Sequence, residues 1–203
     1  MTLSDDDGLL ASGRLGGEED GRAAVEVTST KRVVRRGVVV SVALSPPKGD
    51  RFAWAIQKLA EMGVDEVIPV RTSRSVRDWD GQRWRRVETR LRTVAREAAM
   101  QSRQAFVTRV VDPMPLEESL RVSGASLVVL APMGSVRLRE CLPEDATAVR
   151  LVVGPEGGFE PSELDRAIEF GATVAGLGDQ ILRTETAAVV SVALVLHRYG
   201  RLG

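Results

Sequence analysis

Two patterns of apolar and polar residues divide the chain near residue 45. Before that point, short runs rich in β-branched residues, separated by glycine-containing turns, predict strands over residues 8–15, 22–34 and 37–44. The Ser-Pro-Pro-Lys-Gly-Asp sequence at 45–50 is typical of a boundary, so we expect one domain over residues 1–45 and another over 46–203. Three strands are few for a closed barrel, and we expect the first domain to have open edges.

From residue 51 onward, helical and strand patterns alternate. Apolar residues at spacings of three and four predict a helix over 82–101 with arginines on its opposite face. Continuous apolar runs at 126–131 and 149–153 predict strands that are buried on both faces. Further helices are expected over 51–62, 134–142, 161–170 and 184–199, and further strands over 64–70 and 172–177. This alternation predicts an α/β domain with a mostly parallel sheet.

The composition narrows the possible chemistry. Cys141 and His197 are the only cysteine and histidine among 203 residues, so neither an intrachain disulfide nor a zinc site of the usual Cys/His type can be assembled. A Ser-His-Asp triad would need His197, which lies in an apolar predicted helix, and the sequence has no nucleophile elbow. Met1–Asp7 is acidic and unlike a secretory signal, and the apolar run at 187–196 is about half as long as a membrane span. We therefore expect a soluble, cytoplasmic protein without a metal.

Net charge is zero, but positive charge is concentrated in one segment. Residues 71–109 contain eleven arginines against four acidic residues, a net charge of +7, whereas the whole chain has three lysines. Arginine binds phosphate with paired hydrogen bonds and stacks on bases, so this segment favours an RNA- or DNA-binding face. A solvated helix face in an arginine-rich protein explains the same pattern equally well.

Two loops follow predicted strands, at the edge where open α/β sheets bind ligands. The first, Gly154–Phe159, has glycines that let a ligand approach bare backbone, yet it is neither a dinucleotide-binding fingerprint nor a P-loop. The second, Leu177–Ala187, enters a helix through Thr184, a plausible N-cap. Its residues that we expect to hold an adenine or to face a reacting group are Ile181, Leu182, Arg183 and Glu185.

Together and in register, the two loops resemble the signature loops of the SPOUT methyltransferases. The likeness is closest to the RsmE-type enzymes, which methylate N3 of a uridine in small-subunit (16S) ribosomal RNA. Shorter matches follow the family's order along the chain and are Lys48–Arg51, Ile56–Lys58, Glu61–Val64, Ile68–Pro69, Arg74–Val76, Glu97–Ala99 and Gln101–Ser102. Either loop alone is moderately specific for the family. The two loops and the shorter matches, in the family's order over about three quarters of the chain, are strong evidence for the resemblance.

The resemblance implies a C-terminal trefoil knot, a known exception to the rule against knots, and a PUA-like, RNA-binding β-domain over residues 1–45. It also implies bound S-adenosylmethionine, a homodimer, small-subunit ribosomal RNA or the 30S subunit as partner, and no metal. The cofactor-binding residues that it implies are Leu130, Ala131, Gly154, Pro155, Glu156, Gly157, Gly158, Leu177, Gly178, Ile181, Leu182, Thr186 and Ala187. The catalytic residues would be Arg183, Thr184 and Glu185, and those facing the RNA would be Arg74, Gln101, Ser102 and Arg103.

Methylation at a uridine N3 makes its own demands on the site. The imide nitrogen becomes a good nucleophile only after it loses its proton, so the protein must orient the base, assist deprotonation and stabilise the anion. Arg183 is the candidate for stabilising negative charge on the uracil carbonyls, and Glu185 is a possible base. The target base must also turn out of its stack to reach the methyl group. A simpler alternative, in which Arg183 and Glu185 merely pair with each other, remains open.

Other simple explanations and some departures from the family also remain open. In these explanations Gln101 and Ser102 cap the end of the helix predicted over 82–101, and Lys58 and Glu61 form an ion pair on a helix surface. Relatives carry a longer PUA-like barrel, so either sequence precedes Met1 or the barrel is truncated and incomplete. The family's usual residues are absent at Met100, at Arg103-Gln104, and at Leu130-Ala131-Pro132, where a His-Glu is common.

Two alternative functions follow from these doubts about the RNA-facing residues. One is a SPOUT methyltransferase that acts on another ribosomal or transfer RNA position. The other is a non-catalytic, RNA-binding factor in ribosome assembly.

Overall fold

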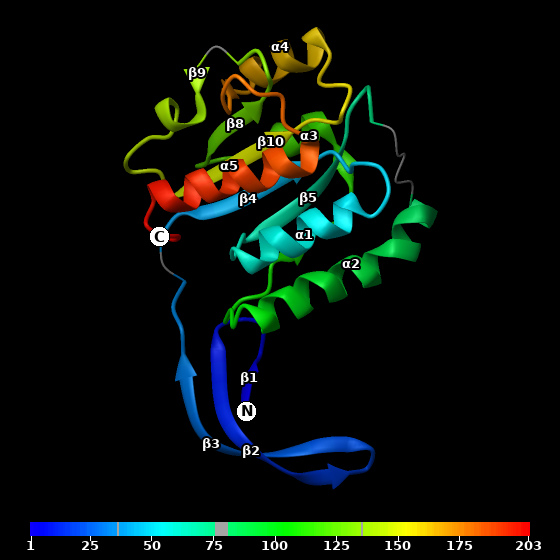
Figure 1. Cartoon of the computed structure of the whole chain (residues 1–203), viewed down its shortest axis with the longest axis vertical. Coiled ribbons are helices and arrows are strands. Elements are labelled where there is room, and N and C mark those ends of the chain that lie inside the picture. The colour runs from blue at the N-terminus through cyan, green and yellow to red at the C-terminus, as the bar shows by residue number, and fades with distance from the viewer. Residues whose placement is uncertain (36, 76–80, 135) are drawn as a thin grey trace.

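The computed structural model of the chain describes residues 1–35, 37–75, 81–134 and 136–203. Within them the larger body is a parallel sheet with helices on both faces, and a smaller antiparallel sheet projects from it (Figure 1). Val76, which belongs to one of the motif matches, lies outside the described residues. No helix of the described part is long and apolar enough to cross a membrane.

The larger sheet has eight strands in the order β6-β5-β4-β10-β8-β11-β9, with β7 beside β5, and each of its strand pairs is parallel. Its central strands are continuous apolar runs that are buried on both faces, as the sequence predicts. The mostly parallel α/β fold is therefore confirmed. The strands are β4 (Val39–Leu44), β5 (Glu66–Arg71), β6 (Arg109–Val110), β7 (Met114–Pro115), β8 (Ser126–Leu130), β9 (Val136–Arg137), β10 (Ala148–Val153) and β11 (Thr173–Gly176).

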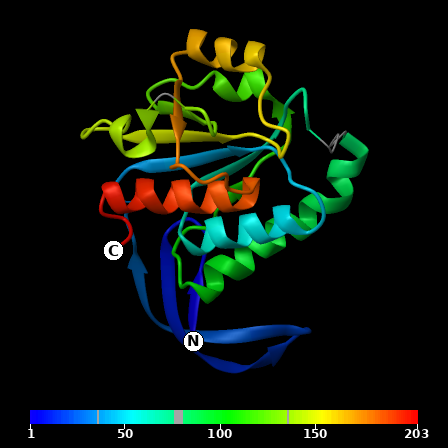
Figure 2. The same cartoon turned by 45° about the horizontal axis from the view of Figure 1, so that its top comes forward.

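Helices cover the two faces of this sheet unequally (Figures 1 and 2). On one face lie α1 (Arg51–Glu61), α2 (Gly81–Gln101) and α5 (Thr184–Arg198), and on the other lie the shorter α3 (Leu116–Leu120) and α4 (Pro161–Glu169). Phe52, Ile56 and Leu59, which share one face of α1, are at most 2% exposed. Burying a side chain of this size contributes about 1.5–3 kcal/mol, so the apolar stripe of α1 anchors it to the sheet.

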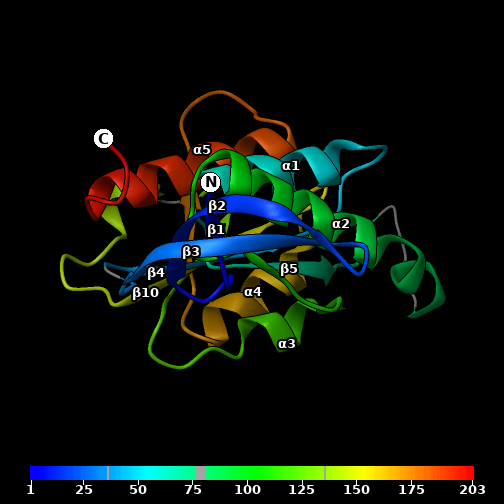
Figure 3. The same ribbon diagram turned by 90° about the horizontal axis from the view of Figure 1, so that it is seen from below.

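The N-terminal strands form a separate three-stranded antiparallel sheet. It consists of β1 (Thr2–Ser4), β2 (Leu9–Glu19) and β3 (Arg22–Arg32), and β3 is exposed along most of its length. The long β2–β3 hairpin projects from the molecule (Figure 1) and crosses beneath it (Figure 3). A few contacts attach this sheet to the end of α2, among them Gly8 N–H to Ala105 O at 3.0 Å and the Arg96–Asp6 ion pair at 2.9 Å.

The strand expected over 37–44 does not join the N-terminal sheet. It is β4, at the centre of the parallel sheet, where Val42 lies beside Leu151 of β10 and Val67 of β5. The domain boundary expected after residue 45 is therefore wrong, and the change of sheet occurs between β3 and β4. The reason is visible in the strand itself, because Val39–Leu44 is almost wholly apolar and suits a strand covered on both faces.

Two smaller expectations also change. Residues 136–140 form β9 and a single 3₁₀ turn (Leu138–Glu140) instead of the expected helix over 134–142. The short elements β1, β6, β7 and α3 carry too few residues to show a periodic pattern, and sequence reasoning missed them.

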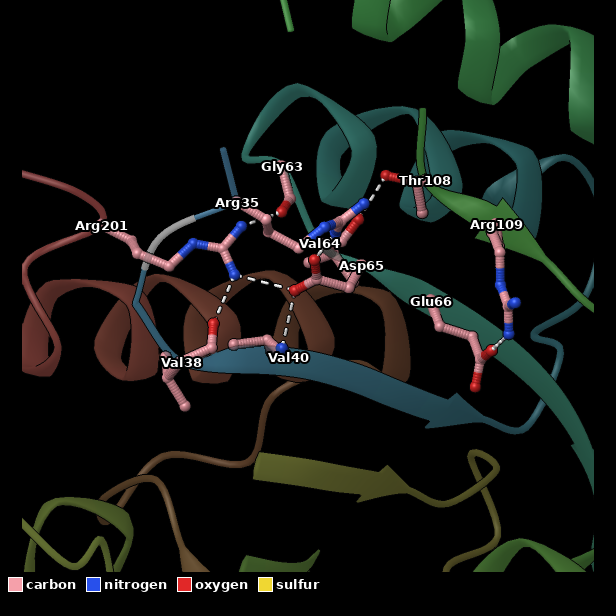
Figure 4. A network of polar contacts seen from close by, with 10 residues as sticks. All are labelled: Arg35, Val38, Val40, Gly63, Val64, Asp65, Glu66, Thr108, Arg109 and Arg201. Carbon is pink, nitrogen blue, oxygen red and sulfur yellow. Dashed lines mark hydrogen bonds and ion pairs between the residues drawn. The ribbon is translucent and has the colours of Figure 1, made fainter. Parts of the chain in front are cut away.

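A buried carboxylate, Asp65, joins the linker after β3 to the C-terminal tail (Figure 4). It is 8% exposed, accepts hydrogen bonds from Val40 N–H and Arg201 Nη1, both at 2.8 Å, and forms an ion pair with Arg35. Arg201 donates further to Val38 O at 2.6 Å and to Gly63 O. Burial lowers the pKa of the Arg201 guanidinium from its ordinary value, so Asp65 offsets the cost of burying that cation.

We expect Asp65→Ala to lower the free energy of unfolding by about 3 kcal/mol, since breaking a buried pair leaves the other charge uncompensated. Urea denaturation followed by circular dichroism measures this loss. The matched control is Glu144→Ala, which removes an ion pair to Arg198 whose carboxylate is 91% exposed, and it should cost less than about 1 kcal/mol. Equal losses in the two variants would show that the ion pairs and hydrogen bonds of Asp65 contribute no more to stability than a surface ion pair.

Candidate functional site

A cavity of about 370 Å³ opens at the carboxyl ends of β8, β10 and β11. Three chain segments line it: residues 130–133 after β8, residues 153–159 after β10, and residues 175–187, which run from β11 into α5. Because parallel strands end at one edge of the sheet, segments distant in sequence meet there. The volume lies within the range of small-molecule sites in proteins.

The glycine loop, residues 154–159, turns sharply at the end of β10. Gly158 has φ +71°, and its N–H donates to Pro155 O at 2.9 Å to close the turn. A side chain at Gly154 would put its Cβ 2.8 Å from the Phe159 ring, so the glycine lets that ring fold back over the loop. Phe159 and Leu164 consequently add apolar surface to the cavity wall.

The second loop, residues 177–183, is tied to the glycine loop by Thr184. The hydroxyl of Thr184 donates to Gly154 O at 3.1 Å. The N-cap of α5 is Arg183, with φ −65° and ψ 152°, so the expectation that Thr184 caps the helix is wrong. The Thr184 hydroxyl bonds to the other loop instead of capping its own helix. Such a tertiary hydrogen bond cannot be predicted from the sequence at the start of a helix.

Glu185 lies behind the cavity wall, at the first turn of α5. It is 7% exposed, and its Oε1 is 3.6 Å from Arg51 Nε. Within the described residues its Oε2 is buried without a hydrogen-bond partner. The simpler alternative of an Arg183–Glu185 pair is not what the structure has, because the ion-pair partner of Glu185 is Arg51.

The structure brings most of the expected cofactor residues together. Eleven of the thirteen line the cavity, together with Arg183 and Thr184, whereas Gly157, Thr186 and the expected catalytic residue Glu185 do not. Further lining residues that sequence reasoning missed are Pro132, Met133, Val153, Phe159, Leu164, Ala175 and Gln180. Phe159 and Gln180 stand inside the two loops and could have been found there, while Leu164 and Ala175 reach the cavity only through packing.

The residues expected to face RNA lie in two places. Arg74 contacts the back of the glycine loop, with Nη1 3.0 Å from Gly157 O and Nε 3.4 Å from Glu160 Oε1. Gln101, Ser102 and Arg103 lie at the far end of α2, beside the N-terminal sheet (Figure 1), and do not line the cavity. Within one chain, Gln101 and Ser102 therefore lie apart from the cavity, and their expected approach to the RNA stays a prediction.

Two of the simpler explanations describe what the structure has. Ser102 Oγ donates to Ala98 O at 2.8 Å, so this hydroxyl caps the end of α2. Lys58 Nζ lies 2.7 Å from the half-buried Glu61 Oε1, about one turn further along α1. Among the residues that the structure describes, no group of three or more His, Cys, Asp or Glu side chains could hold a metal ion.

Comparison with known proteins places this fold and cavity in a family. A family described as RNA methyltransferase domain matches residues 35–196. A relative from Mycobacterium bovis, called ribosomal RNA small subunit methyltransferase E, is 35% identical over 207 aligned residues, covering 96% of this chain and 77% of the relative. A relative of the same name from Bacillus subtilis is 33% identical, covering 79% of this chain and 66% of that protein. The chain belongs to the RNA methyltransferase family.

A solved structure agrees with this assignment. The ribosomal RNA small subunit methyltransferase E of Neisseria gonorrhoeae, bound to S-adenosyl methionine, superposes with a TM-score of 0.88 at 27% sequence identity, covering 97% of this chain and 82% of that one. The agreement extends over both the parallel sheet and the N-terminal strands, because nearly all of this chain is covered.

The cavity wall near Met133 depends on a close backbone approach at Gly134. A Cβ at this position would lie 2.2 Å from the carbonyl carbon of Ala175, and Ala131 N–H donates to Ala175 O at 3.0 Å. The loop after β8 is therefore packed directly on β11.

We expect Gly134→Ala to destabilise the fold by about 1–3 kcal/mol, the usual cost of overpacking, and to displace the cavity wall. The melting temperature measures the destabilisation. Gly81→Ala is the matched control, because nothing lies within 4 Å of a Cβ there and the residue begins α2, so this change should be neutral or slightly stabilising. An unchanged melting temperature for Gly134→Ala would contradict the close packing.

Proposed function

We propose that this protein transfers a methyl group from S-adenosylmethionine to N3 of a uridine in small-subunit (16S) ribosomal RNA. The observation that carries the proposal is the single cavity into which the fold gathers residues of both signature loops. The names of the mycobacterial and neisserial relatives support the RNA class and the cofactor. The choice of a uridine N3 rests on the resemblance to the RsmE-type enzymes.

The cavity suits S-adenosylmethionine in both size and chemistry. Apolar side chains, among them Leu130, Leu177 and Leu182, would hold the adenine, and the glycine-rich backbone at 154–158 offers hydrogen-bonding groups at close approach. The bound cofactor supplies a methyl group activated by its sulfonium. The proposal includes the trefoil knot, in which the segment from residue 177 onward threads through a loop of the chain.

The residues at the start of α5 supply the remaining chemistry. Arg183, exposed at the cavity, stabilises the negative charge that develops on the uracil carbonyls as N3 loses its proton. Glu185 does not itself line the cavity but follows Thr184, which does, and it is the proposed acceptor of that proton. Thr184 holds the two loops together, and N3 forms its bond to the methyl carbon as the carbon–sulfur bond breaks. The proton then passes to solvent. No metal takes part in these steps.

The N-terminal sheet and α2 form the proposed RNA-binding surface. The exposed arginines of α2 include Arg85 and Arg86, and residues 101–103 continue this surface toward the N-terminal, PUA-like sheet. Arg92 and Arg96 pair with Asp112 and Asp6 at 3.2 and 2.9 Å, so part of the positive charge is already neutralised within the chain. The reaction is expected in the cytoplasm, where small ribosomal subunits are assembled.

The proposal also includes a homodimer. The outward side of α5 carries Leu194, which is 42% exposed, with Val190 and Ala193 partly buried beside it, and the neighbouring α1 exposes 45% of Trp54. Apolar side chains grouped in this way on adjoining helices suit a protein interface.

We expect Leu194→Glu to convert a dimer into a monomer, because the interface would have to bury an unpaired charge. Multi-angle light scattering at micromolar concentration measures the mass. The control Leu202→Glu changes an equally exposed leucine (42%) in the tail after α5 and should leave the mass unchanged. A monomeric wild-type protein would contradict the dimer.

The function is tested by tritiated methyl transfer from S-adenosylmethionine to small ribosomal subunits that lack this methylation, followed by nucleoside mass spectrometry. We expect 3-methyluridine to form. We expect Arg183→Ala to keep the fold and to lower the rate by about a hundredfold or more, the scale of losing one preorganised electrostatic group.

Other outcomes of the same assay point to the alternatives. A different methylated nucleoside would indicate another target position. Cofactor binding without any incorporation into small subunits or transfer RNA would favour a non-catalytic assembly factor. Unchanged turnover in Arg183→Ala would remove this residue from the mechanism.

A further inference from the structure

The first turn of α1 stands beside both loops of the cavity. The carboxyl ends of β4 and β10 are neighbours, with Leu44 opposite Val153, and Ser45 N–H donates to Val153 O at 2.9 Å. The chain leaves β4 through residues 45–50 and starts α1 at Arg51. This side chain consequently begins next to the glycine loop, although it is more than a hundred residues away in sequence.

Arg51 reaches one carboxylate from each side of the site. Its Nη1 lies 3.9 Å from Glu156 Oε1 in the glycine loop, and its Nε lies 3.6 Å from Glu185 Oε1 in the first turn of α5. Glu156 also accepts a hydrogen bond from the backbone N–H of Lys48 at 3.3 Å. Glu185 has Arg51 as its ion-pair partner among the described residues. Loss of Arg51 would therefore leave Glu185 without its ion-pair partner, whereas Glu156 would keep its hydrogen bond to Lys48.

The surroundings of Glu185 are unusual for a merely structural ion pair. A carboxylate 7% exposed would normally have both oxygens hydrogen-bonded, yet its Oε2 has no partner among the described residues. Arg51 lies at ion-pair distance from one oxygen, on the side of α1, and no described residue hydrogen-bonds to the other oxygen. A buried oxygen left in this way is able to accept a proton or a hydrogen bond.

We propose that Arg51 is a positioning residue for methyl transfer, which orients the Glu185 carboxylate so that its free oxygen can serve the reacting base. This inference rests on the proposed function. Neither Arg51 nor Glu185 lines the cavity, and Arg51 acts through Glu185, which follows the lining residue Thr184. Its loss therefore slows the chemical step while cofactor affinity changes little.

The test is a double-mutant cycle with Arg51→Ala, Glu185→Gln and the combined variant, measured by single-turnover methylation of small ribosomal subunits. We expect Glu185→Gln to slow the reaction by about a hundredfold, the low end of general acid–base contributions, and Arg51→Ala by about tenfold or more. The double variant should be no slower than Glu185→Gln alone, because residues that act as a unit are not additive. Arg51→Lys should recover part of the loss.

Two further readouts separate positioning from a role in stability. Calorimetry should give an S-adenosylmethionine dissociation constant for Arg51→Ala within about threefold of the wild type, a change of under 1 kcal/mol. The control Arg121→Ala removes an exposed pair to Glu117 of α3 at 2.9 Å, outside both loops, and should leave the rate unchanged.

Additive losses in the cycle, or a weakened cofactor affinity with an unchanged rate at saturation, would overturn the positioning role. A wild-type protein without methyl transfer would instead overturn the proposed function, and the role of Arg51 with it.

Discussion

The parallel pairing of β4, β10, β8 and β11 is the constraint on which the rest of this structure depends. Parallel strands need crossovers, so each strand ends at the same edge and each following loop starts there. Three stretches without any shared local sequence, at residues 45–51, 154–159 and 177–187, are thus brought to one place. The apolar core holds the strands in place, and the strand ends set where each loop begins. Few contacts between the loops are therefore needed to form the cavity.

Those few contacts are polar and individually weak. The Thr184–Gly154 hydrogen bond at 3.1 Å and the Lys48–Glu156 hydrogen bond at 3.3 Å join the three loops, and each such bond is worth about 1 kcal/mol. The loops are therefore free to adjust to a ligand at little cost to the fold. Arg51 differs from these contacts because it spans two loops with one rigid guanidinium, which suits a residue that sets the direction of a carboxylate.

The sequence predicts the features that local residue patterns determine, but not those that depend on which strands pair or which distant segments touch. The glycine loop and the Leu177–Ala187 loop were predictable because each follows a recognisable buried strand. The partner of β4 was not, since a strand's period is the same in either sheet, and only its nearly unbroken apolar run distinguishes it. For the same reason the hydroxyl of Thr184 was predicted to cap its own helix, although it bonds to a loop thirty residues away. The burial of Glu185 and its contact with Arg51 likewise depend on crossovers.

The position of Gln101 and Ser102 bears on how an RNA substrate could be held. Turning a base out of its stack costs a few kcal/mol, which contacts to the flanking backbone must supply, since the cavity receives only the base. Phosphate contacts act at a distance from the reacting atom, and α2 together with the N-terminal sheet offers such a surface away from the cavity. Asp65 holds the linker of that sheet to the C-terminal tail, and the tail continues α5, which begins at the cavity. The proposed RNA-binding surface and the cavity are thus joined through one helix.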